Sequence, residues 1–97
     1  PLPDALVGLA ARLRPQGWDV RAERTERGYQ YVAEFRGTPP CAEDVTVLPH
    51  TPDAFASTIR ENSPEEFKRT LEVSAIRLAW HAAWCPQCWD VVQRAQQ

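Results

Sequence analysis

The chain has 97 residues, of which 43% are hydrophobic and 25% charged, and its formal net charge is −2. This length fits one domain, and this composition is typical of a globular protein and excludes a disordered chain. Basic and acidic residues alternate, as in Glu23–Arg27, which predicts a solvated surface and disfavours nucleic-acid binding. No apolar run reaches the roughly 18 residues of a membrane span, so we expect no membrane partner.

The first half of the chain predicts a helix and a β-hairpin. Residues Pro3–Arg14 carry leucines and alanine at helical spacing, and Pro15 ends the helix. Residues Trp18–Thr25 alternate apolar and polar side chains, which is the period of a half-buried strand. Gly28 closes a turn, and Tyr29–Arg36 repeats the alternation, so we expect these two strands to pair.

The middle of the chain predicts a loop, a third strand and a helix. Two prolines stiffen the segment Gly37–Cys41, which we expect to be a loop. Val45–Leu48 is short and β-branched, which predicts the third strand. Thr51 followed by Pro52 is a helix-start pattern, and it predicts a helix that runs to about Glu61.

The last third predicts a long helix and a short one. Ser63, with a glutamate three residues later, forms a capping box that starts a helix over Pro64–Trp84. Pro86 prevents this helix from continuing, so a final short helix should begin there. The expected fold is therefore α+β, with an N-terminal helix, a three-stranded antiparallel sheet and C-terminal helices packed on one face. This order resembles that of the double-stranded-RNA-binding domain, but the lysine-rich start of that family's last helix is missing here.

The long helix is apolar on two faces, so we expect both faces to be covered. One face can lie on the sheet, and the other needs a neighbouring helix or a partner chain. The first face holds Phe67, Leu71, Ala75, Leu78 and Ala82, and the second holds Val73, Ile76, Trp80 and Trp84. Together with Trp89, the tryptophans Trp80 and Trp84 form a candidate interface for a protein partner or a second copy of the chain.

The residues with the most distinctive spacing are His81, Cys85 and Cys88. They are four and three positions apart, so on helical backbone they share one face, and Pro86 makes Cys85 the cap of a new helix. We expect the positive end of that helix to lower the pKa of both thiols. One imidazole and two thiolates suit Zn²⁺, for which Cys41 is the natural fourth ligand and His50 the reserve.

The pattern His-x₃-Cys-x₂-Cys, with proline after the first cysteine, resembles the zinc-binding motif of zinc-containing anti-sigma factors. The resemblance covers about the last quarter of the chain, and His81, Cys85 and Cys88 match it position by position. It implies a zinc site completed by an upstream ligand, a role that Cys41 could fill, and a regulatory domain that binds another protein. Those domains are helical, whereas a β-hairpin is expected in the first half here.

A weaker resemblance leads to a second interpretation. Trp84-Cys85-Pro86-Gln87-Cys88 is similar to the Trp-Cys-x-x-Cys site of thioredoxin-like oxidoreductases, which implies that Cys85 and Cys88 form a redox pair. That fold needs a strand before the motif and more sheet after it, and the chain stops nine residues past Cys88. A third interpretation is an ordinary α+β binding module whose cysteines only pack.

These patterns favour a small, zinc-stabilised, non-enzymatic domain for protein interaction or regulation. The acidic residues Asp53, Glu65 and Glu66 belong to helix starts, so we identify no catalytic pair of carboxylates. Three cysteines cannot all pair as disulfides within one chain, which favours a reducing, cytoplasmic setting. Residue 1 is not methionine, so we expect residues 1–97 to be a single domain that can be a piece of a longer protein.

Overall fold

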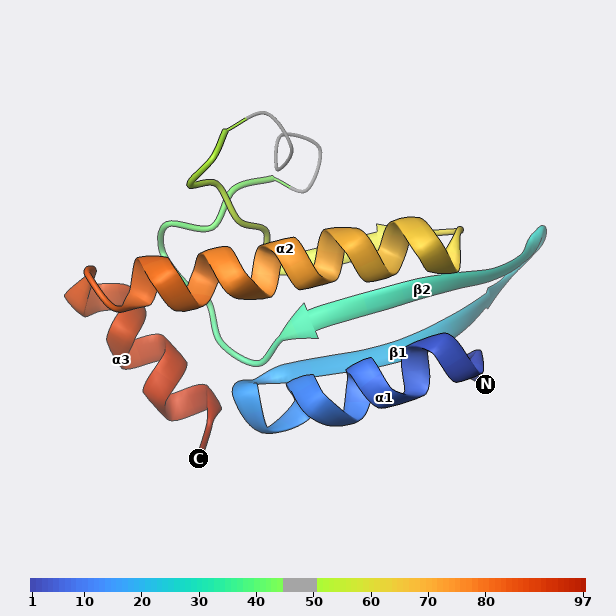
Figure 1. Ribbon diagram of the computed structural model, residues 1–97, viewed down its shortest axis with the longest axis horizontal. Coiled ribbons are helices and arrows are strands. Elements are labelled where there is room, and N and C mark those ends of the chain that lie inside the picture. Colours follow the sequence, from blue (N-terminus) through green and yellow to red (C-terminus); the bar gives the residue numbers. More distant parts are fainter. Residues whose placement is uncertain (45–50) are drawn as a thin grey trace.

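The computed structural model describes residues 1–44 and 51–97 (Figure 1). Its elements, in chain order, are α1 (Asp4–Leu13), a 3₁₀ turn η1 (Arg14–Gln16), β1 (Trp18–Thr25), β2 (Gly28–Phe35), β3 (Thr58–Glu61), α2 (Pro64–Ala82) and α3 (Pro86–Ala95). The three strands form one antiparallel sheet in the order β1-β2-β3. The predicted α+β class is therefore confirmed.

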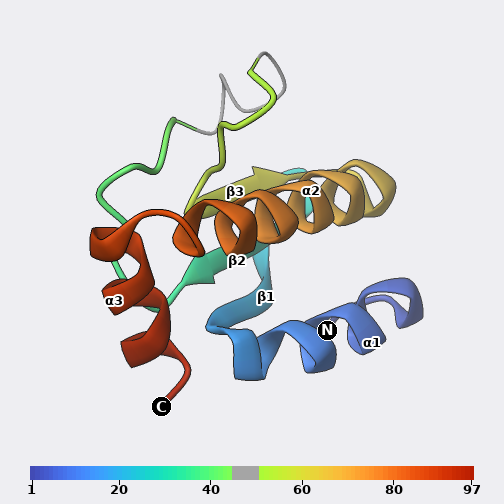
Figure 2. The same cartoon turned by 60° about the vertical axis from the view of Figure 1, so that its left-hand side comes forward.

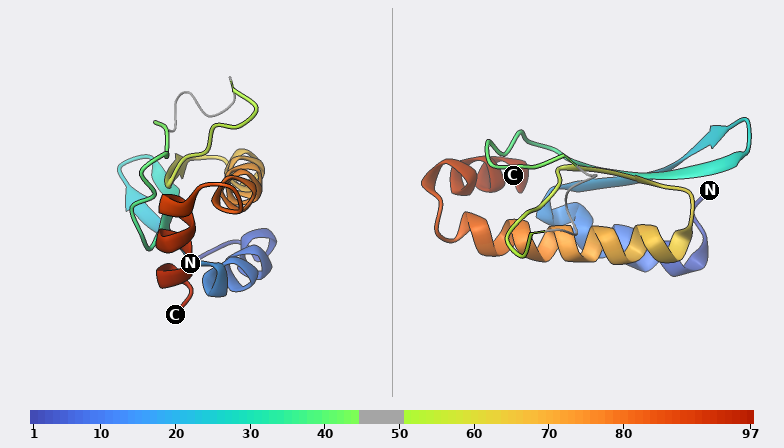
Figure 3. Two further views of the ribbon diagram at one scale, coloured as in Figure 1. Left: turned by 90° about the vertical axis from the view of Figure 1, so that its left-hand side faces the viewer. Right: turned by 90° about the horizontal axis from the view of Figure 1, so that it is seen from above.

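The domain has two layers. Helices α1 and α2 lie side by side on one face of the sheet, and no helix of the described residues lies on the other face (Figure 3). Helix α3 turns back from the end of α2 and crosses the end of the sheet where β2 stops (Figure 1 and Figure 2). None of the helices in the described ranges combines the length and the apolar character that a membrane span requires.

The β-hairpin follows directly from its sequence. Trp18 pairs with Phe35 at one end and Thr25 pairs with Gly28 at the other, so the loop has only two residues. Gly28 adopts a φ of +120°, a conformation that glycine reaches without strain. The alternation in the two strands directs Trp18, Tyr31, Ala33 and Phe35 toward the helices, where Trp18 and Phe35 meet edge to face at 5.3 Å.

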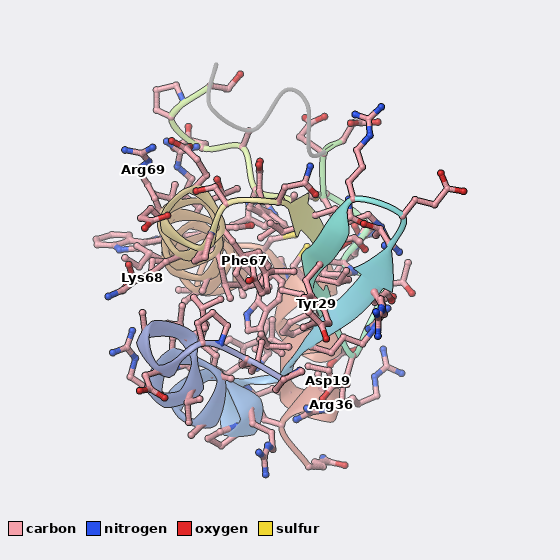
Figure 4. The ribbon with its side chains drawn as sticks, turned by 90° about the vertical axis from the view of Figure 1, so that its right-hand side faces the viewer. Asp19, Tyr29, Arg36, Phe67, Lys68 and Arg69 are labelled. Carbon is pink, nitrogen blue, oxygen red and sulfur yellow. The ribbon has the colours of Figure 1, made fainter. Side chains whose placement is uncertain are left out.

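The outer face of the sheet is charged. Arg21 pairs with Glu23 and with Glu34, and Arg36 pairs with Asp19 at 2.7 Å (Figure 4). These exposed pairs contribute little to stability individually. Val32, which pairs with Arg21 of β1 and Arg60 of β3, points to this face and is nevertheless fully buried.

The third strand of the described sheet lies in a segment that the sequence predicted to be helical. Val45–Leu48 lies outside the described residues, and the helix predicted up to Glu61 is wrong, because Thr58–Glu61 is β3. The helix-start pattern at Thr51 produces a single turn, in which the Ala54 N–H donates to the Thr51 carbonyl at 3.1 Å. The next three residues, Ala54, Phe55 and Ala56, are all buried, which a surface helix with one apolar stripe could not achieve.

Helix α2 organises the core. Ser63 caps it, accepting the Glu66 N–H at 3.3 Å, as the capping box predicted. The predicted first face is buried, whereas on the second face Ile76 and Trp80 are exposed. Seen from the N-terminal end of α2, Phe67 points toward the sheet while Lys68 and Arg69 point away from it (Figure 4).

Candidate metal centre

Four side chains that can ligate a metal meet where α2 turns into α3. Cys41 comes from the loop after β2, His81 from the last turn of α2, Cys85 from the N-cap of α3 and Cys88 from its first turn. One ligand atom from each of the four lies within 4.8 Å of the others. The structure thus brings together the four predicted ligands, and the reserve ligand His50 lies outside the described residues.

The corner between the two helices positions three of these residues. Helix α2 ends at Ala82, and the His81 carbonyl accepts the N–H groups of Trp84 and Cys85 at 3.0 Å each. Pro86 then occupies the first position of α3, as the sequence predicted. The chain therefore turns sharply within three residues, and the His81 ring and the two thiols come to lie on the same side of the corner.

The loop that carries Cys41 is held at both ends. Before Cys41, Gly37 lies so close to α3 that a Cβ on it would be 2.5 Å from the Val91 Cγ1. After Cys41, the Glu43 N–H donates to the Phe55 carbonyl at 2.8 Å. A glycine that only fits without a side chain and a short backbone bridge therefore bring this distant cysteine to the helix corner.

A support that the sequence analysis missed holds His81 in place. The His81 ring packs on Phe55 with a centroid distance of 5.3 Å. Phe55 is fixed in turn by the buried hydroxyl of Ser74 in α2, which accepts the Ala56 N–H at 2.9 Å and donates to the Ala56 carbonyl at 2.6 Å. The sequence contained one signal for this support: Ser74 is a polar residue on the face of α2 that is buried in the core.

One ring nitrogen of His81 has no hydrogen-bond partner among the described residues. This atom, Nε2, is buried. A buried polar atom without a partner is costly, so native structures rarely contain one unless it serves a ligand or a water. A buried, unpartnered nitrogen on a histidine that lies beside three thiols fits a bound metal ion.

The two helix thiols differ in acidity. The pKa of Cys85 is lowered, chiefly because the backbone N–H of Cys88 faces its sulfur, with smaller contributions from neighbouring thiols. Burial raises the pKa of Cys88 to about 11. The prediction that the helix end lowers the pKa of both thiols is therefore wrong for Cys88, whose complete burial outweighs its position in the first turn.

The donor set is compatible with a bound metal ion. Three sulfurs and one imidazole nitrogen are soft ligands of the kind that Zn²⁺ and other thiophilic metals take, whereas Ca²⁺ and Mg²⁺ require oxygen. In a tetrahedral zinc site, bond lengths of about 2.3 Å to sulfur place two sulfurs about 3.8 Å apart. The observed limit of 4.8 Å lies close to that spacing, so a small inward movement of the side chains would complete the geometry.

The chain matches no protein-family model, no curated protein and no solved structure. Its function has to be inferred from its own residues. The thioredoxin-like interpretation lacks its fold, because α2 leads into the Cys85 motif where that family has a strand. The candidate interface residues Trp80, Trp84 and Trp89 are 70%, 82% and 50% exposed.

Proposed function

We propose that the chain is a zinc-stabilised, non-enzymatic domain for protein interaction or regulation, with Cys41, His81, Cys85 and Cys88 as the ligands. Two observations support this proposal: four donor atoms, one from each residue, lie within 4.8 Å of one another, and the Nε2 atom of His81 is buried with no hydrogen-bond partner among the described residues. Four protein ligands leave no open coordination position, which is the arrangement of structural zinc rather than catalytic zinc. The resemblance to the anti-sigma-factor motif supports the ligand set but not a sigma-factor partner, because the first half is a helix and a sheet.

The interaction role rests on the surface beside the metal centre. Trp80 and Trp84 are both largely exposed, although tryptophan is among the residues most enriched in the energetic centres of protein interfaces. Zinc would fix the corner that carries Trp84, and thereby the shape of this surface. Zinc bound by thiolates also fits a reducing compartment such as the cytoplasm.

The proposal is tested by metal content and by cobalt spectroscopy. Protein purified without chelator or added metal should contain about one zinc per chain by mass spectrometry. After exchange into Co²⁺, the thiolate-to-cobalt absorption should weaken in Cys41→Ser, while Thr38→Ser in the same loop serves as the matched control. Metal-free protein, or a Cys41→Ser spectrum equal to that of the wild type, would contradict the assigned ligand set.

A redox function is the second candidate, favoured by one observation. Cys85 is partly exposed, and Cys88 is buried directly behind it, which is the arrangement of an attacking and a resolving thiol. This function requires protein without metal in which Cys85 and Cys88 oxidise reversibly to a disulfide while the fold is retained. A free-thiol titration on the same sample distinguishes the two candidates.

A further inference from the structure

The exposed face of α2 has the shape of a helix-packing surface. Ile76, Trp80 and Trp84 are spaced four residues apart, so their side chains form a continuous row along α2 and just past its end. We call these three residues the α2 ridge. They are 59%, 70% and 82% exposed, respectively.

A hollow lies on each side of the α2 ridge. One hollow, of about 530 Å³, separates the ridge from the segment that contains Pro52 and Asp53. The other, of about 200 Å³, separates Ile76 from Leu13 and Gln16 at the end of α1 and in η1. The segment of residues 51–57 and helix α1 indeed lie on opposite sides of α2 (Figure 1 and Figure 2).

We infer that this face docks on the same face of a second copy of the chain, with the ridge of each copy seated in a hollow of the other. A ridge of residues spaced four apart and flanked by grooves is self-complementary. Interdigitation of two such ridges is the commonest way in which helices pack, at a crossing angle near −50°. With a twofold axis through the contact, each copy uses the same surface, so that both ridges are covered in the same way. The inference deepens the proposed function, on which it rests, by naming the partner.

The charges around the ridge favour self-association over a strongly charged partner. The larger hollow has one acidic and one basic residue in its lining, Asp53 and Arg77. The smaller hollow is bordered by Arg12 and Glu72, which form an ion pair at 3.3 Å. Neither rim therefore presents a block of one sign that would repel a second copy of the chain.

The exposed area of the α2 ridge sets the expected strength of the dimer. A fully covered aromatic side chain buries roughly 150–250 Å², so the exposed fractions of 70% and 82% for Trp80 and Trp84 give about 300 Å² per copy. Two copies then bury about 600 Å² of tryptophan surface, half of the roughly 1,200 Å² at the lower end of specific interfaces. Ile76 and the hollow walls add to this area, and a contact at or below the lower end of specific interfaces corresponds to a weak dimer that dissociates on dilution.

The test is the mass of the zinc-loaded chain by sedimentation velocity, from low micromolar concentration upward. The mass should rise from one chain toward two, and Trp80→Glu should weaken association by about thirtyfold, because a charge replaces the central anchor. Val7→Glu is the matched control: Val7 is an exposed apolar residue of a helix, 52% accessible, it lines neither hollow, and the variant adds the same charge. Trp80 is itself exposed, so Trp80→Glu should still fold, and its circular dichroism spectrum tests this expectation.

Three results would overturn the inference: a single-chain mass at every concentration, a Trp80→Glu variant that associates as the wild type does, or an equal loss in Val7→Glu. Zinc content is measured on the same samples. A zinc-loaded protein that stays monomeric rejects the dimer and leaves the metal proposal standing, whereas metal-free protein rejects the metal proposal.

Discussion

Replacing His81 by phenylalanine should change the stability of the domain in opposite directions with and without zinc. Phenylalanine keeps an aromatic ring against Phe55, which now lies 5.3 Å from the imidazole. It removes the buried Nε2 that has no partner among the described residues. The substitution therefore separates the packing of this side chain from its ability to bind a metal.

The two effects can be estimated. In the metal-free protein, an unsatisfied buried polar atom costs about 1–3 kcal/mol, so His81→Phe should raise the free energy of unfolding by up to that amount. Structural zinc contributes about 10–16 kcal/mol of apparent binding free energy in small peptides. If His81 supplies a quarter of it, its loss should lower the free energy of unfolding of the zinc-loaded protein by roughly 3 kcal/mol.

Urea unfolding followed by circular dichroism measures both changes. One series contains excess zinc with a reductant that does not bind metal, and the other contains EDTA. Trp84→Phe, an exposed aromatic substitution next to the centre, should change the free energy of unfolding by no more than about 0.5 kcal/mol in either series. If His81→Phe changes stability in the same direction in both series, His81 is not a zinc ligand and the assigned metal centre is wrong.

Three further predictions follow from the contacts around the core. Ser74→Ala should cost about 1–3 kcal/mol in urea unfolding, because both backbone groups of Ala56 lose their buried partner, and an unchanged midpoint would show that water replaces the hydroxyl. In EDTA, stability should fall as pH rises from 9.0 toward about 11, because burial raises the pKa of Cys88 and only the unfolded chain releases this proton at the start of that range. This fall should be absent in Cys88→Ala. Gly17→Ala should destabilise by more than about 1 kcal/mol, since Gly17 has a φ of +115° and a Cβ would lie 2.6 Å from an aromatic carbon of β2. Gly8→Ala, in the open interior of α1, should instead stabilise by up to about 1 kcal/mol, and thermal unfolding of the pair checks both signs.

The elements with strong local signals could be predicted from the sequence. The hairpin has an unbroken alternation over both strands and a glycine at the turn, and its register follows from these features. Helix α2 has a capping box at Ser63 and an apolar stripe that packs on the sheet. In each case the local preference and the tertiary packing agree.

The third strand could not be predicted, because local and tertiary preferences conflict there. Thr51 and Pro52 form a correct helix start by local rules, yet the sheet needs a partner for β2. Ile59 pairs with Ala33 and is fully buried, so the strand gains core packing that a helix in this segment would forgo. Tertiary packing decided the outcome, and no periodicity within four residues can reveal it.

The Cys/His cluster was predictable from the sequence in its local part only. The spacing of His81, Cys85 and Cys88 places them together on any helical backbone. Cys41 lies 40 positions before His81, and its approach depends on Gly37 fitting against α3 without a side chain. The supporting residue Ser74 was missed, because its role depends on a loop whose path the sequence does not specify.

The position of the four donors explains where a metal would act in this fold. Cys88 belongs to the hydrophobic core, whereas Cys41 is exposed, so the centre spans the edge of the core from inside to outside. Helix α1, the sheet and α2 share a core of large side chains, to which α3 adds the buried residues Cys88, Val92 and Ala95 and the partly buried Val91. A metal bound by this set would therefore stabilise α3 and the Cys41 loop far more than the rest. Because Trp84 lies in the corner next to Cys85, the same metal would also fix one end of the α2 ridge and couple zinc binding to the interaction surface.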